Sequence, residues 1–207
     1  MKKYINFILA GILVAALVAI MVLIKNGEIV NFDNNVFNLV TSNENTFIEN
    51  MYRVFTFLGS TIFIIVACLC ILVFMKNKKM AGVIVGLVAV STVVNNVIKL
   101  IFRRERPGVR RLVEEHSFSF PSGHTMAAVT LYGILIFFVM KSKLNKKARI
   151  AISIVLGLLP ICVAVSRIYL GAHYASDVIG ATITSTALLL VETYFIEKYY
   201  DKIAKQQ

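Results

Sequence analysis

The chain has 207 residues, of which 58% are hydrophobic, and its mean hydropathy is +0.78. So large an apolar share excludes an ordinary water-soluble domain. The net charge of +11 comes from 22 basic and 11 acidic residues, and it is spread over the flanks of apolar segments. Because there is no basic soluble domain with interleaved aromatic residues, this charge does not indicate nucleic-acid binding.

Uncharged apolar runs predict the membrane spans, since a helix needs about 20 apolar residues to cross a bilayer. Long runs occupy residues 4–24, 54–75 and 80–98, and shorter ones occupy 125–140, 150–165 and 178–191. We therefore predict an all-α, polytopic membrane protein: one domain over residues 1–207, with six transmembrane helices in a bundle. Lys2 and Lys3 before the first run are also typical of a signal peptide, but the run is long for one, and we expect a retained span.

The first connection, residues 25–53, is polar but carries an apolar pattern. Apolar side chains recur there at helical spacing, at Ile29, Phe32, Val36, Phe37 and Val40. This pattern predicts a short helix lying at the membrane interface between the first two spans. Its apolar face could either pack on the bundle or guide a lipid substrate, and packing is the favoured interpretation.

The distribution of lysine predicts how the chain is oriented. With six spans, four basic clusters fall on one side, around residues 2–3, 76–79, 141–149 and 198–205. Basic residues are retained in the cytoplasm, so we expect both termini there and the other connections on the extracytoplasmic side of the cell membrane. The three cysteines, Cys68, Cys70 and Cys162, lie inside predicted spans and indicate neither a disulfide framework nor a zinc site.

The first polar segment on the opposite side is KLIFRRERP, residues 99–107. Lys99 offers a compact point charge, and Arg106 offers a planar fork that can bind two phosphate oxygens at once. Asn95 and Asn96, one turn before Lys99, are expected to face the bundle and to form hydrogen bonds between helices.

The second polar segment is Pro121-Ser122-Gly123-His124, directly before an apolar run. Ser122 is a good N-cap, and the N–H groups of the helix start that follows can bind an anion. His124 would lie in the first turn, able to donate or accept a proton. As a capping signature alone, however, this segment is common.

The third polar segment is SRIYLGAHYASD, residues 166–177. His173 and Asp177 are four residues apart and share a helix face, so the carboxylate can hold one ring nitrogen and leave the other as a nucleophile. A lone pair of this kind is more often a structural hydrogen bond. Arg167 adds a second fork for phosphate oxygens.

Together the segments read Lys-x6-Arg-Pro, Pro-Ser-Gly-His and Ser-Arg-x5-His-x3-Asp, within residues 99–177. This pattern resembles the type-2 phosphatidic acid phosphatase superfamily, membrane lipid phosphatases that share a phosphate site with vanadium haloperoxidases. Every defining position is present at the family's spacing. A haloperoxidase is disfavoured because those proteins are soluble.

The resemblance implies a role for each motif residue. His173 would be the nucleophile that forms a phosphohistidine, Asp177 would orient it, and His124 would protonate the leaving oxygen. The phosphate oxygens would be bound by Lys99, Arg106, Ser122, Gly123 and Arg167. Three cations and helix-terminal N–H groups suit a phosphoryl transition state, and no cluster of carboxylates offers a magnesium site, so we expect neither a metal nor a cofactor.

Other polar residues lie outside the pattern. His116 is best interpreted as a loop histidine. The remaining arginines of the outer cluster, Arg103, Arg104, Arg110 and Arg111, could hold a second phosphate or a lipid headgroup.

The sequence therefore predicts an integral-membrane lipid phosphatase acting on the extracytoplasmic face, with a membrane lipid phosphate and the bilayer as its partners. The candidate substrates are phosphatidylglycerophosphate, undecaprenyl pyrophosphate and phosphatidic acid, and the sequence does not choose among them. The alternative is a carrier or scaffold that only binds phosphate or phospholipid. His173 and Asp177 discriminate between these, because binding alone needs no oriented nucleophile.

Overall fold

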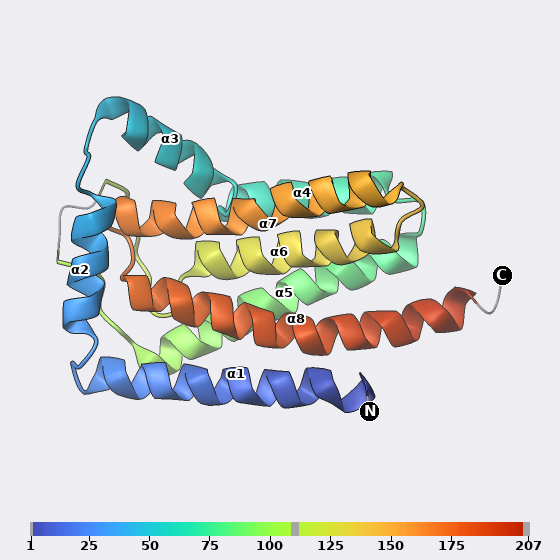
Figure 1. Cartoon of the computed structure of the whole chain (residues 1–207), viewed down its shortest axis with the longest axis horizontal. Coiled ribbons are helices and arrows are strands. Elements are labelled where there is room, and N and C mark those ends of the chain that lie inside the picture. The colour runs from blue at the N-terminus through green and yellow to red at the C-terminus, as the bar shows by residue number, and fades with distance from the viewer. Residues whose placement is uncertain (1, 109–111, 205–207) are drawn as a thin grey trace.

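The computed structural model describes residues 2–108 and 112–204. In these ranges the chain forms eight helices and no strand, which confirms the all-α prediction. The helices are α1 (Lys2–Lys25), α2 (Val30–Val40), α3 (Thr46–Phe57), α4 (Thr61–Phe74), α5 (Lys78–Phe102), α6 (Gly123–Lys141), α7 (Lys146–Tyr169) and α8 (Ala175–Ala204). The long helices form a bundle, α2 lies across one end of it, and α3 projects at an angle from its side (Figure 1).

Five of the six expected spans are single helices, and the second expected span is divided between two. Five helices, α1, α5, α6, α7 and α8, are each long and apolar enough to cross a membrane. The predicted run 54–75 is divided between α3 and α4, whose axes are bent by 45° at residues 58–60. Counted as one span, this pair is the sixth. The protein is therefore a multi-pass membrane protein.

Local sequence accounts for the break between α3 and α4. Ser60 is the N-cap of α4, and its hydroxyl accepts a hydrogen bond from the N–H of Phe63 at 3.2 Å. At Gly59, a Cβ atom would lie only 2.6 Å from Cγ1 of Val163 and 2.8 Å from the carbonyl oxygen of His124. Glycine thus lets the turn contact the first turn of α6 directly.

The predicted amphipathic helix is α2, and its apolar face packs on the bundle. Three of the predicted side chains, Val36, Phe37 and Val40, contact a cluster formed by Ile168, Ala175 and Val178 at the ends of α7 and α8. The packing interpretation is confirmed for these three. Phe32, by contrast, is 43% exposed.

α6 occupies the centre of the bundle, where it packs against α4, α5, α7 and α8. The largest buried cluster joins four helices through Ile64, Met80, Ile84, Val88, Leu131, Ile134 and Ile196. A hydrogen bond of 2.8 Å between the hydroxyls of Ser91 and Thr130 links α5 to α6. In lipid there is no hydrophobic driving force for the association of helices, so close packing and interhelical hydrogen bonds of this kind hold them together.

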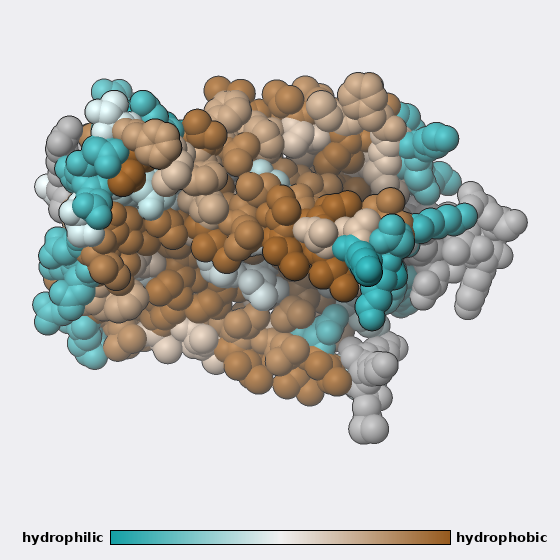
Figure 2. Space-filling view, turned by 45° about the horizontal axis from the view of Figure 1, so that its top comes forward, coloured by the Kyte–Doolittle hydropathy of each residue, from teal (hydrophilic) through white to brown (hydrophobic). Residues whose placement is uncertain are grey.

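The two ends of the bundle carry different connections and different polar residues. Both termini and the α4–α5 and α6–α7 connections lie at one end, while α2, the α5–α6 loop and the α7–α8 turn lie at the other (Figure 1). Between these ends the face shown in Figure 2 carries a hydrophobic belt, with hydrophilic side chains at both extremities. The lysine-bearing connections therefore share one end, and the predicted site residues share the opposite end.

The described part of the α5–α6 loop turns back over the bundle. Arg103 ends α5 in the left-handed region, with φ at 50°. The N–H of Ser119 then donates to the carbonyl of Arg104 at 2.8 Å, which folds the loop on itself. Phe120 precedes a cis bond to Pro121 and is fully buried. A Cβ at Gly180 would overlap the Phe120 ring, so this glycine lets the loop pack directly on α8.

Candidate active site

The eight predicted site residues lie at the same end of the bundle, on four helices and the segments between them. They are Lys99 in the last turn of α5, Arg106 in the following loop, Ser122, Gly123 and His124 at the start of α6, Arg167 in the last turn of α7, His173 in the α7–α8 turn and Asp177 in the first turn of α8. The fold thus gathers three motifs that are far apart in sequence.

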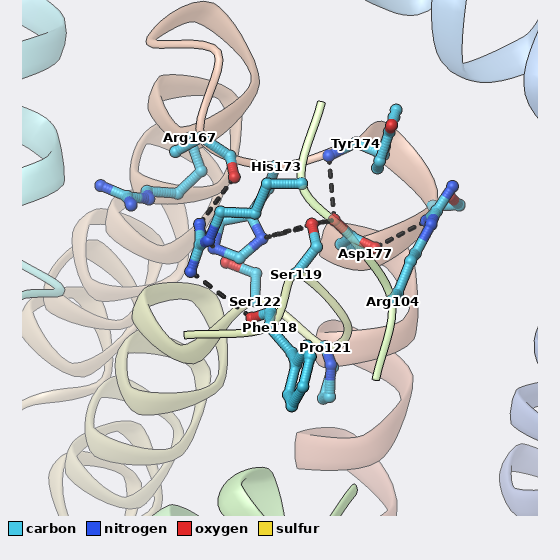
Figure 3. A network of polar contacts seen from close by, with 12 residues as sticks. Arg104, Phe118, Ser119, Pro121, Ser122, Arg167, His173, Tyr174 and Asp177 are labelled. Carbon is cyan, nitrogen blue, oxygen red and sulfur yellow. Dashed lines mark hydrogen bonds and ion pairs between the residues drawn. The ribbon is translucent and has the colours of Figure 1, made fainter. Parts of the chain in front are cut away.

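His173 and Asp177 form a buried pair, with Nδ1 of the imidazole 3.3 Å from Oδ2 of the carboxylate. Their side chains are 1% and 0% exposed. The N–H of Tyr174 and the hydroxyl of Ser119 also donate to the same Oδ2 (Figure 3). On the far side of the ring, Nη1 of Arg106 lies 3.4 Å from Nε2.

These contacts assign the protonation of His173. A guanidinium can only donate, so Nε2 facing Arg106 carries the lone pair and Nδ1 carries the hydrogen donated to Asp177. Burial lowers the pKa of His173 to about 4, although the hydrogen bond and charge of Asp177 act in the opposite direction. The imidazole is therefore neutral near pH 7, with Nε2 available as a nucleophile.

Lys99 and Arg106 are held side by side by the α5–α6 loop. Nζ of Lys99 donates to the hydroxyl of Ser117 at 2.9 Å and to the carbonyl of Phe118 at 2.8 Å. Arg106 donates to the same two residues, and also to the carbonyl of Ala172 at 2.7 Å. The loop thus holds Lys99 beside Arg106, and Arg106 lies next to the imidazole.

Arg167 is the third cation, and a carboxylate that the sequence analysis did not single out contacts it. Nη1 of Arg167 donates to the hydroxyl of Thr56 at 2.7 Å, while Nη2 donates to Oε1 of Glu115. The other oxygen of Glu115 lies 3.5 Å from Arg106, and Oε1 lies 3.9 Å from Nδ1 of His124. Glu115 therefore occupies the space between the predicted phosphate ligands.

Glu115 is ionised at neutral pH. Burial favours its neutral form, but the neighbouring cations, Arg167 first, outweigh burial and hold the pKa of its carboxyl below the usual value. An ionised carboxylate among three cations is where a bound anion would be expected. The internal carboxylate thus takes the place of an external anion.

Ser122 occupies the N-cap position of α6 as predicted, but its hydroxyl does not cap the helix. Instead it accepts a hydrogen bond from the hydroxyl of Thr125 at 3.0 Å. The first N–H groups of α6, from Gly123 onward, have no acceptor within their own helix, so they can bind an anion.

The amides that precede Lys99 differ in orientation. Asn95 is buried, and its Nδ2 donates to the carbonyl of Pro121 at 3.2 Å, which ties the start of α6 to α5. The expected interhelical role is confirmed for Asn95. For Asn96 the prediction is wrong, because this side chain is exposed: one residue along a helix turns the side chain by about 100°.

A cavity of about 770 Å³ runs between α4 and α5 and ends at the site. Its length is lined by apolar side chains, among them Ile65 and Leu69, which are also exposed on the hydrophobic belt. Its polar end is lined by Lys99, Arg106, Glu115, His124 and His173. The site is therefore connected to the apolar surface of the bundle.

A second cavity, of about 690 Å³, lies beside the α5–α6 loop. It shares Lys99, Arg106 and Glu115 with the first cavity, and its other lining residues include Arg104, Glu105 and His116. Lys99 and Arg106 thus border both cavities.

Arg104 contradicts the hypothesis of a second phosphate ligand. Its Nη1 donates to Oδ1 of Asp177 at 2.6 Å, and its Nη2 donates to Oδ2 of Asp33 on α2 at 2.8 Å. With both ends of the guanidinium on carboxylates, it is not available for a phosphate. Arg103 is exposed and donates to the carbonyl of Leu100. The other two, at positions 110 and 111, lie outside the described residues.

The described residues contain no group of three or more His, Cys, Asp and Glu side chains that could hold a metal ion. The acids that reach the site, Asp33, Glu115 and Asp177, are each bound to arginine. The chemistry available in this part of the chain is that of one oriented imidazole, a second histidine, three cations and helix-terminal N–H groups.

The model of the PAP2 superfamily matches residues 80–201, which is more than half of the chain. The chain belongs to the PAP2 superfamily. The family expected from the three motifs is thereby confirmed.

Relatives of this PAP2 protein include phosphatidylglycerophosphatase B of Bacillus subtilis (strain 168), which is 36% identical over 135 residues. The match covers 64% of this chain and 64% of that relative, so it spans just under two thirds of the relative's length.

Two solved structures are similar to this PAP2 protein. The first transmembrane PAP2 type phosphatidylglycerolphosphate phosphatase from Bacillus subtilis matches with a TM-score of 0.82 and 25% identity, over 91% of this chain and 96% of that one. LpxE of Aquifex aeolicus matches with a TM-score of 0.63 and 24% identity, over 77% and 93% of the two chains, and shows the similarity of fold alone. The all-helical PAP2 membrane fold is thus confirmed over nearly the whole chain.

Proposed function

We propose that this PAP2 protein is an integral-membrane hydrolase that removes phosphate from a lipid phosphate monoester or pyrophosphate. The observation that carries this proposal is the neutral imidazole of His173, with Nδ1 on Asp177 and Nε2 beside Arg106 at the polar end of the cavity. A carrier or scaffold requires cations and donors, but it has no need of a buried nucleophile with an orienting carboxylate.

The first half of the reaction transfers the phosphoryl group to the protein. The lone pair on Nε2 of His173 attacks phosphorus, an N–P bond forms, and the P–O bond to the lipid breaks. For this step His124, which lines the same end of the cavity, must be the imidazolium when the anionic substrate is bound, and it then gives its proton to the leaving oxygen. The imidazole gains positive charge as the bond forms, and Asp177 stabilises that charge through Nδ1–H.

The second half releases the phosphate. Water attacks the phosphorus of the phosphohistidine, the N–P bond breaks, and His124 accepts the proton of the water. Lys99, Arg106, Arg167 and the first N–H groups of α6 bind the equatorial oxygens, where charge is spread in the transition state. The proposed reaction needs no metal ion, because these donors supply the charge stabilisation.

The cavity indicates the class of substrate. Its walls between α4 and α5 are apolar and reach the hydrophobic belt, so they can hold lipid chains while the phosphate lies among the cations. Phosphatidylglycerophosphate, phosphatidic acid and undecaprenyl pyrophosphate all have this form. The similarity to a phosphatidylglycerophosphatase favours the first of these.

The extracytoplasmic side is proposed for the site, because the lysine-bearing connections lie at the opposite end of the bundle. A cysteine introduced at position 116 should react with a membrane-impermeant thiol reagent in intact cells, and one introduced at position 143 should not. The reverse pattern would place the site in the cytoplasm.

Phosphate release by the purified protein in detergent with EDTA tests the proposed reaction. We expect release from at least one of the three lipids, presented at equal mole fractions, and little release from glycerol 3-phosphate, which lacks the chains that fill the cavity. His116→Ala is the matched control, since this exposed loop histidine should leave activity unchanged. No release from any lipid, with inorganic phosphate still raising the thermal midpoint, would instead support a carrier.

Glu115→Gln should strengthen the binding of phosphate. The ionised carboxylate accepts a hydrogen bond from Arg167 and forms an ion pair with Arg106, so it competes for the two groups that a phosphate needs, and the amide lacks its charge. Charge-assisted hydrogen bonds contribute about 1.5–3 kcal/mol, so we expect the inhibition constant for inorganic phosphate to fall by about tenfold or more. Glu114→Gln, at the exposed neighbouring acid, is the control. An unchanged inhibition constant would show that Glu115 does not compete with phosphate.

A further inference from the structure

Asp33 is an acid on the amphipathic helix α2, yet it is only 2% exposed. Both oxygens of its carboxylate accept hydrogen bonds. Oδ1 accepts the N–H of Ser176 at 2.8 Å, and Oδ2 accepts the hydroxyl of Ser176 at 2.7 Å and Nη2 of Arg104 at 2.8 Å. Burying a carboxylate is costly unless it is paired, so these partners must offset its desolvation.

Arg104 joins this carboxylate to that of Asp177. Its Nη1 donates to Oδ1 of Asp177 at 2.6 Å and to the hydroxyl of Ser176 at 2.7 Å (Figure 3). The guanidinium also lies 4.0 Å from the centre of the Tyr174 ring, which restricts its plane. One planar cation is therefore fixed between two carboxylates, one on α2 and one on α8.

This arrangement assigns each oxygen of Asp177 a separate task. Oδ1 is held by Arg104, while Oδ2 accepts from His173 Nδ1, from Ser119 and from the N–H of Tyr174. Because Oδ1 is anchored, the carboxylate cannot rotate away from the imidazole. The orientation of the nucleophile is thus fixed through two further residues.

We propose that Asp33 and Arg104 are positioning residues of the reaction, which make α2 part of the catalytic apparatus. The inference rests on the proposed phosphatase function and deepens it. Docking of α2 alone does not require the buried ion pair, because Val36, Phe37 and Val40 already pack on α7 and α8. The chain of contacts from Asp33 ends instead on the imidazole.

Asp33 and Arg104 also affect His173 through their charges. Arg104 by itself would weaken the negative potential that Asp177 presents to His173, and Asp33 offsets that effect. The other charged or titratable groups that act on the imidazole come from different elements: Arg106 and Glu115 from the loop, His124 from α6 and Arg167 from α7. The contacts given above for these four groups do not include Asp33 or Arg104, so variants of the pair leave those contacts in place.

The opposite charges predict opposite pH effects. Removing the negative charge of Asp33 leaves more of the positive charge of Arg104 acting on His173. This disfavours the imidazolium form of His173. The acidic limb of the profile of kcat/KM against pH should therefore move to lower pH in Asp33→Asn. Removing the charge of Arg104 favours the imidazolium, so this limb should move to higher pH in Arg104→Gln. A role in folding alone would not produce shifts of opposite sign.

The test measures kcat, KM and the pH profile of phosphate release for the full chain in detergent. We expect Asp33→Asn to lower kcat by about 10- to 100-fold with KM within about twofold of wild type, since the phosphate-binding cations are untouched. The double variant with Arg104→Gln should lose less than the product of the single losses, because each residue acts through the other. Glu28→Gln, at an exposed acid just before α2, is the matched control.

Arg104→Lys keeps the charge but cannot bridge two carboxylates, so it should lower kcat while leaving the acidic limb near its wild-type position. It replaces Arg104→Gln if that protein does not fold. A folded Asp33→Asn protein with wild-type kcat and pH profile would overturn this inference and leave the proposed function standing. Shifts of the same sign in both charge variants would do the same. Wild-type protein without phosphatase activity would overturn the proposed function and this inference together.

Discussion

Replacement of His173 by alanine is expected to lower kcat by about 10⁴-fold or more, because no other group can form the covalent intermediate. His173 lies beside Arg106 and Asp177, and the second histidine of the site, His124, lacks the carboxylate partner of α8. The measurement is phosphate release by the variant from the preferred lipid, with EDTA, against wild type and His116→Ala.

The same variant tests the intermediate itself. Wild-type protein quenched in alkali during turnover should carry phosphate on one histidine, and this modification should be absent from His173→Ala and lost on acid treatment. Folding of the variant is checked by its thermal midpoint and its binding of inorganic phosphate. Substantial turnover by a folded His173→Ala protein would falsify the assignment of the nucleophile.

Asp177→Asn is expected to lower kcat by about 10³- to 10⁴-fold, as loss of the orienting carboxylate does in other histidine-dependent hydrolases. The amide has nearly the same shape, but it cannot stabilise the charge that His173 acquires on attack. It also gives up the ion pair with Arg104 at Oδ1. The KM for lipid should change little, because the side chain does not line the cavity between α4 and α5.

Steady-state kinetics of this variant, with pre-steady-state measurement of the first turnover, separate formation of the phosphohistidine from its hydrolysis. The first step should be the slower one in Asp177→Asn. Glu28→Gln, at an exposed acid outside this network, gives a comparison in which the carboxylate and its partners are retained. An effect of Asp177→Asn on KM alone would argue for a role in binding the substrate and against a role in orienting His173.

The features that the sequence predicted share a physical cause: they are local or periodic. Apolar runs identified the helices because the length of a span is set by the bilayer. The amphipathic pattern at Val36, Phe37 and Val40 identified α2 because a helix repeats every 3.6 residues. The three motifs were readable because their spacing and residue types carry a family pattern, and the match to residues 80–201 confirms the family.

The break in the second span was missed because the run 54–75 contains no charge. Only Gly59 and Ser60 signal it, and that pair is also tolerated within a span. What decides the break is the direct approach of this turn to Val163 and to the backbone of His124. Those contacts join segments that are far apart in sequence, so no local pattern records them.

The acids of the site were missed for a related reason. Glu115 lies in the run Glu114-Glu115-His116, where nothing local shows which side chain turns toward the cations. Asp33 lies on the polar side of an interfacial helix, where an acid is normally solvated. Its burial depends on Arg104, 71 residues away, and that partner was interpreted as a phosphate ligand.

The two cavities meet at Lys99, Arg106 and Glu115, one lined by apolar side chains and the other by polar ones. In the proposed reaction, the first cavity suits the departure of the dephosphorylated lipid, and the second suits the departure of inorganic phosphate. Each turnover thus delivers its products into different phases, the bilayer and the water. Reversal would require both products to re-enter the same site from different sides, which slows their recombination but leaves the equilibrium of hydrolysis unchanged.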